Sequence, residues 1–140
     1  MRMQLHLVAL GPWIAQLVVA TFFIVGFIDI YMAMWHTAFR NLHTTQAKRL
    51  AYRISLMLLS IGVSAILHFV GYISGVNAMM FHNIGLFVLL FALLDADINF
   101  GEYFIRCAAV IIVWAMHHVN DIASIKFFIS IGILLFMLIV

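Results

Sequence analysis

Apolar runs alternate with short polar stretches along the whole chain. Five such runs are expected to be membrane spans: about Pro12 to Trp35, Ile54 to Ile73, Ala78 to Leu94, Glu102 to His118, and from about Ile125 onward. A helix needs about 20 apolar residues to cross the hydrocarbon core of a bilayer. The pattern therefore predicts an all-α membrane protein, a bundle of about five transmembrane helices.

Basic residues orient this bundle. Four of the seven Lys and Arg residues lie in the polar stretch 37–53: Arg40, Lys48, Arg49 and Arg53. The positive-inside rule places that stretch in the cytoplasm. We therefore expect the N-terminus outside and the C-terminus cytoplasmic, in a multi-pass protein of the bacterial cytoplasmic membrane. The last run stops at Val140 without a polar anchor, so residues 1–140 are expected to be a single transmembrane domain, truncated before a cytoplasmic output domain.

Composition supports the membrane interpretation. The chain is 67% hydrophobic and only 9% charged, whereas soluble domains are about 25% charged. The formal net charge is only +2, and most of the basic residues lie in one loop. We therefore expect the lipid bilayer as a partner and no nucleic acid.

Four histidines are the candidate functional residues. Counting along the helices at about 1.5 Å per residue places His68, His82, His117 and His118 at a similar height, in the outer third of the bilayer. Ionisable side chains are costly there and mark function by default. Helix bundles commonly build cofactor sites from side chains on facing helices. Because neighbouring helix residues point about 100° apart, only one of His117 and His118 can face a given point.

Two kinds of cofactor fit these residues. In the first, haem b is ligated by His68 and by His117 or His118, with His82 as substitute or supporting partner; the apolar surroundings favour this reading. Iron held between two helices would sense redox state or a diatomic gas. In the second, three of the histidines bind copper or zinc, including a hydrolytic zinc site with Asp121 as base. A polar network without cofactor is the remaining alternative.

The sequence also allows predictions for an acidic residue and three glycines within the expected spans. Asp29 lies within the first run and needs a partner, for which Arg53 and Arg106 are expected. Three glycines are expected to permit close helix approach: Gly62, Gly71 and Gly85.

The stretches Phe87 to Asp95 and Ile111 to His118 resemble the N-terminal membrane modules of membrane-anchored diguanylate cyclases of Gram-positive bacteria. That resemblance implies a sensory module preceding a cytoplasmic GGDEF output domain that makes cyclic di-GMP. A two-chain output enzyme also implies a homodimer, with the first and last spans as contacts. No GGDEF motif occurs in these 140 residues, so no catalytic residue is assigned. Histidine-ligated cofactors are not a general property of such modules, so the cofactor site rests on the residues alone.

Overall fold

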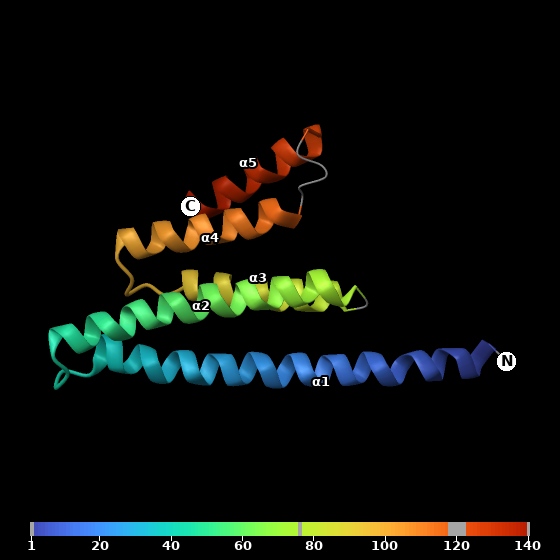
Figure 1. The fold of residues 1–140 in the computed structure, drawn as a ribbon, viewed down its shortest axis with the longest axis horizontal. Coiled ribbons are helices and arrows are strands. Elements are labelled where there is room, and N and C mark those ends of the chain that lie inside the picture. The colour runs from blue at the N-terminus through green and yellow to red at the C-terminus, as the bar shows by residue number, and fades with distance from the viewer. Residues whose placement is uncertain (1, 76, 118–122, 140) are drawn as a thin grey trace.

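The computed structural model describes residues 2–75, 77–117 and 123–139, with residues 2–10 and 117 described through their backbone. All the regular structure in these ranges is helical (Figure 1), which confirms the all-α prediction. The elements are α1 (Arg2–Trp35), η1 (His36–Arg40), α2 (Gln46–Ser74), α3 (Ala78–Leu93), α4 (Phe100–His117) and α5 (Ile125–Ile139), where η1 is a π-helical turn.

Two helical stretches of the described chain are long and apolar enough to cross a membrane, judged by length and composition. They are Gly11–Arg40 and Gln46–Ser74. Helices α3 and α5 are also apolar but shorter. The structure therefore agrees with a membrane protein, and the five-span bundle stays a prediction.

Two helix starts differ from the prediction. Helix α1 does not begin at Pro12 but runs through it from Arg2; proline removes a single backbone donor, and membrane helices tolerate that loss. Helix α2 begins at Gln46, well before the predicted Ile54. Its first turns are rich in Gln, Ala, Lys, Arg and Leu, which are strong helix formers, so the helix extends beyond the apolar run.

The helices are arranged around the α2–α3 hairpin, which has the most extensive helix contact in the molecule. In Figure 1, α1 lies along one side of this hairpin, and α4 followed by α5 lies on the other. Helix α1 continues past the α2–α3 turn toward the N-terminus. Helix α5 has no buried residue, so it contributes little to the core.

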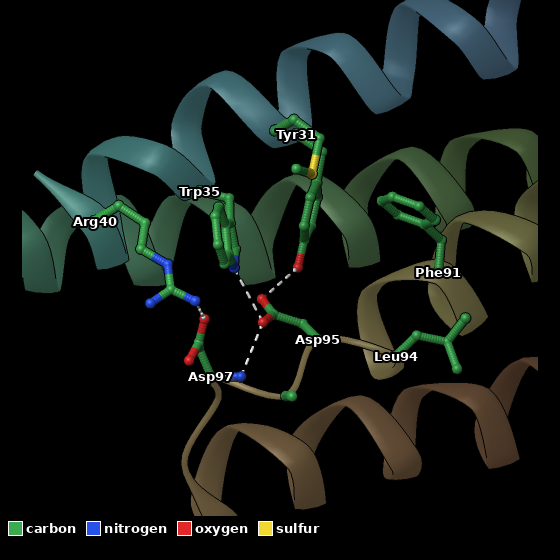
Figure 2. A pocket seen from close by; sticks show the side chains of 9 residues that line it. Tyr31, Trp35, Arg40, Phe91, Leu94, Asp95 and Asp97 are labelled. Atoms are coloured by element: carbon green, nitrogen blue, oxygen red, sulfur yellow. Dashed lines mark hydrogen bonds and ion pairs between the residues drawn. The ribbon is translucent and has the colours of Figure 1, made fainter.

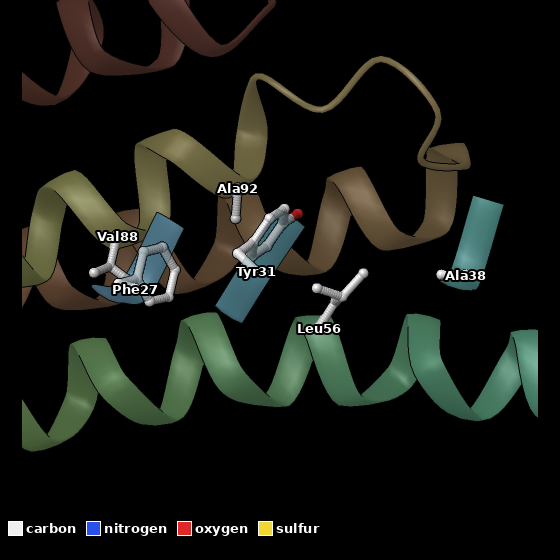
Figure 3. Close-up of a cluster of buried hydrophobic side chains, with 6 residues drawn as sticks. All are labelled: Phe27, Tyr31, Ala38, Leu56, Val88 and Ala92. Carbon is white, nitrogen blue, oxygen red and sulfur yellow. The ribbon is translucent and has the colours of Figure 1, made fainter. Parts of the chain in front are cut away.

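The main core lies where α1, η1, α2 and α3 meet (Figure 3). Its buried side chains are Phe27, Tyr31, Ala38, Leu56, Val88 and Ala92. A second cluster joins α3 to α4 and contains Leu89, Val110 and Val113. Together the two clusters hold α1, η1, α2, α3 and α4 against one another. They thereby position the polar side chains at the end of the molecule that carries the α1–α2 connection.

Candidate functional site

The structure places two of the four predicted histidines side by side. His68 on α2 and His82 on α3 stack with ring centroids 5.2 Å apart and ring planes at 14°. His68 is buried, at 8% exposure. The counting of helical rise correctly put these two residues at one height.

Glycine makes room for each ring on the opposite helix. A Cβ atom at Gly85 would lie 2.5 Å from Cε1 and Nδ1 of His68, and one at Gly71 would lie 2.6 Å from Cδ2 and Nε2 of His82. Both distances are shorter than real Cβ contacts, so any residue larger than glycine would displace the ring or the helix. The close-approach prediction is therefore confirmed for these two glycines and is wrong for Gly62, which has open space within 4 Å.

The placing of each histidine ring against a glycine of the other helix follows a sequence pattern that the prediction missed. Each histidine precedes a glycine by three positions, in His68-Phe-Val-Gly71 and in His82-Asn-Ile-Gly85. Residues three apart share a helix face. Each helix therefore presents, on one face, a histidine ring and the space left by a glycine, which we call a glycine notch. In an antiparallel hairpin the two faces are complementary. The repeated His-x-x-Gly spacing is the signal that could have predicted the pair.

One hydrogen bond fixes the orientation and tautomer of His68. Its Nδ1 lies 2.7 Å from the carbonyl oxygen of Ser64, one turn earlier, and 3.4 Å from the Ser64 hydroxyl. A carbonyl can only accept, so Nδ1 carries the proton and donates it. The Nε2 atom of this tautomer then presents a lone pair, as in histidines that ligate metals.

As placed, His68 and His82 do not converge on one ion. A ligating nitrogen directs its lone pair within the ring plane, and these two rings occupy stacked planes rather than one shared plane. Among the side chains described, no group of three His, Cys, Asp or Glu residues is placed to hold a metal. His117 is described only as the last residue of α4, and His118 and Asp121 lie outside the described residues, so their ligand roles stay predictions.

A second polar site lies at the opposite end of the hairpin (Figure 2). The Asp95 carboxylate accepts hydrogen bonds from the Tyr31 hydroxyl at 3.2 Å and from Trp35 Nε1 at 3.0 Å. Arg106, only 1% exposed, donates from Nη1 to the Tyr31 hydroxyl at 3.2 Å and to the Ala92 carbonyl. A single hydroxyl thus bridges a buried guanidinium and a carboxylate. We call Tyr31, Trp35, Asp95 and Arg106 the polar latch, because they connect α1, the α3–α4 connection and α4.

Two ion pairs flank the latch. Arg40 and Asp97 are 3.2 Å apart and help to line a cavity of about 330 Å³, together with Tyr31, Trp35 and Asp95 of the latch. Arg53 forms a two-point contact with Glu102, at 2.9 and 3.1 Å, joining α2 to α4. The first pair joins η1 to the α3–α4 connection, and the second joins α2 to α4.

The expected pairing of Asp29 is wrong. Arg53 is engaged by Glu102, and Arg106 by Tyr31. Asp29 lies on the exposed side of α1, whereas Phe27 and Tyr31, two positions before and after it, are buried. At about 100° per residue, those two positions face away from Asp29. Similar depth along the helices was therefore insufficient, because the helix face decides the partner.

No protein-family model, curated protein or solved structure matches this chain. The functional argument therefore rests on the residues and their geometry.

Proposed function

We propose that this chain is a transmembrane sensory module that binds haem b through His68 and one of two further histidines, either His117, the last residue of α4, or His118. Its signal would control a cytoplasmic output domain, a diguanylate cyclase. The observation that supports the ligand assignment is the hydrogen bond from His68 Nδ1 to the Ser64 carbonyl. Such bonds fix ring orientation and raise the basicity of the other nitrogen.

Helix packing supports the choice of α4 for the second ligand. Helix α2 contacts α4 as well as α3, and Ile61, two turns before His68, packs against the cluster that contains Val110 and Val113 of α4, so α4 is the further helix that could share a group with His68. His82 already covers one face of the His68 ring, which suits a supporting role rather than that of a second axial ligand. The surrounding segment Ala65 to Val70 is otherwise wholly apolar, as a porphyrin pocket requires.

The polar latch offers a route for the signal. A redox change or a bound diatomic gas would alter the pull between α2 and α4, and it would shift the module only through different affinities for its two states. Helix α4 carries Arg106, which is tied through Tyr31 to α1 and Asp95. A displacement of α4 would therefore act on α1 and on the α3–α4 connection together.

The same proposal includes the topology and the assembly. The basic 37–53 stretch supports an N-terminus outside, five spans and a cytoplasmic C-terminus in the bacterial cytoplasmic membrane. A homodimer is supported by Asp29, a carboxylate on the outward face of a helix apolar enough to span. Ionisable residues in membrane segments normally face protein or water rather than lipid, so a second copy would cover this face.

The visible absorption spectrum of the purified chain tests the haem proposal. We expect a Soret band that shifts on reduction. His68→Ala should remove the band while the far-ultraviolet circular dichroism stays helical, and His43→Ala, an exposed residue of the α1–α2 connection, should change neither. A parent protein without a Soret band, or a His68→Ala protein with an unchanged one, refutes the assignment.

Copper or zinc is the second candidate, favoured by the proximity of two imidazoles from facing helices. Binding one ion would require the stacked rings to rotate so that their nitrogens converge. Metal analysis of the same sample decides: about one copper or zinc per chain without a Soret band supports this reading. If zinc is found, loss of hydrolytic activity in Asp121→Asn would identify the enzyme alternative.

A further inference from the structure

A second cavity, of about 350 Å³, lies between η1 and the first turns of α2. Its lining is Ala38, Phe39, Gln46, Arg49, Leu50 and Arg53. The four α2 residues follow the spacing i, i+3, i+4 and i+7, so they form one face of that helix. One part of the lining is apolar, and the other presents two guanidinium groups and an amide.

The positive charge in this cavity is only half compensated. Arg53 is paired with Glu102. Arg49 donates from Nη2 to the Asn41 carbonyl at 2.8 Å, but that acceptor is neutral. The Arg49 Nε atom is buried and has no hydrogen-bond partner in the described part of the chain. A buried donor of a charged group without an acceptor costs free energy, so the cavity favours an anion that approaches Arg49.

The start of α2 adds to this preference. Thr45, at the N-cap, makes no side-chain hydrogen bond to the first turn. The backbone N–H groups and the positive end of the helix dipole at Gln46 therefore still attract negative charge.

The position of the cavity indicates where the anion comes from. It lies between the end of Gly11–Arg40 and the start of Gln46–Ser74, the two stretches able to span a membrane. In the proposed membrane placement, this is the boundary between hydrocarbon and water. Ala38, Phe39 and Leu50 suit the glycerol and the first acyl carbons of a lipid, and Arg49 suits its phosphate.

We propose that this cavity binds the phosphodiester headgroup of an anionic phospholipid from the adjacent leaflet, with Arg49 as the main ligand. The proposal rests on the membrane placement of α1 and α2 but not on haem binding. Bound lipid would brace η1 against α2, next to the Arg53–Glu102 pair that holds α4. Lipid composition would thereby influence the same end of the bundle as the polar latch.

The test uses the full chain in bilayer nanodiscs that contain phosphatidylglycerol and phosphatidylcholine. Native mass spectrometry should show phosphatidylglycerol retained by the parent protein. Arg49→Gln should reduce retention about tenfold, as expected for the loss of a charge-assisted hydrogen bond. Lys48→Gln removes the same charge from an exposed neighbour outside the cavity lining, and it should retain lipid within about twofold of the parent.

A further variant and two controls keep the proposal falsifiable. Leu50→Trp fills the cavity from an exposed position, 56% accessible, without changing charge, and should also reduce retention. Equal losses in Arg49→Gln and Lys48→Gln would show diffuse attraction and overturn the proposal. Displacement of the lipid by millimolar inorganic phosphate would identify a soluble phosphate ligand instead. Failure of the chain to float with phosphatidylcholine vesicles would refute the membrane placement itself, whatever its Soret band shows.

Discussion

The imidazole of His68 occupies the space that a side chain at position 85 would need. A Cβ on Gly85 would lie 2.5 Å from two atoms of that ring and 3.3 Å from the Ser64 carbonyl oxygen, the acceptor of the His68 hydrogen bond. The position of α3 and the orientation of the histidine are therefore set together. A displacement of His68 toward α3 is therefore expected to move the helix at Gly85.

Gly85→Ala should lower the stability of the hairpin. The added methyl group must displace His68 or α3, and overpacking of this kind costs about 1–3 kcal/mol, against a gain in helix propensity of up to about 1 kcal/mol. Gly62→Ala, where the new methyl group meets no atom within 4 Å, should gain propensity at no such cost. Thermal unfolding followed by circular dichroism in one detergent measures both. Equal midpoints for the two variants would show that the notch does not constrain the ring.

Tyr31→Phe should destabilise the polar latch. The hydroxyl both accepts from Arg106 and donates to Asp95, so its removal leaves a buried guanidinium and a carboxylate each short of one partner. The expected cost is about 1–3 kcal/mol in the free energy of unfolding. Tyr72→Phe is the matched control, since that side chain is 86% exposed and should change stability little. A Tyr31→Phe protein as stable as the Tyr72→Phe control would mean that the network contributes nothing.

Single cysteines test the orientation. A thiol introduced at Thr45, exposed in the α1–α2 connection, should resist a membrane-impermeant reagent in intact cells and react after permeabilisation. A thiol at Ser124, before α5, should react in intact cells. The native Cys107 is only 9% exposed, so the parent protein gives the background. Reversed labelling would place the histidine pair near the cytoplasmic side and contradict the proposed topology.

Hydropathy predicted the helices best where turn residues interrupt them sharply. The predicted third span, from Ala78 to Leu94, differs from α3 by one residue at its end, because Asn77 and Asp95 bound an apolar run. The start of α1 was missed since Pro12 looks like a boundary when local preferences alone are considered. Proline is common in the first turn of a helix, which made Pro12 a plausible start. A long apolar helix nevertheless tolerates the one hydrogen bond that an internal proline removes.

The histidine site shows a different limit of sequence reasoning. Counting the rise per residue gave the common height of His68 and His82, because height depends only on helix ends. The glycine notches depend on the register between α2 and α3, which requires the hairpin itself. The predicted pairing of Asp29 was wrong for a related reason. Its depth matched that of Arg106, but its side chain lies on the exposed face of α1 and not on the face toward the other helices.

Asp29 also provides the sharpest test of assembly. Its carboxylate lies on the exposed face of α1, so in a bilayer a second copy would supply its hydrogen-bonding partner. Asp29→Leu should then weaken dimers in nanodiscs or vesicles about tenfold, matching the roughly 1–2 kcal/mol of a hydrogen bond between membrane helices. Thr21→Leu is the control, because the exposed Thr21 hydroxyl already donates to the Leu17 carbonyl at 2.8 Å and needs no partner. Energy transfer between labelled chains measures the dimer fraction at matched lipid-to-protein ratios. If Asp29→Leu associates as strongly as Thr21→Leu, α1 does not form the interface through this carboxylate, and the contact must be sought on the unburied helix α5.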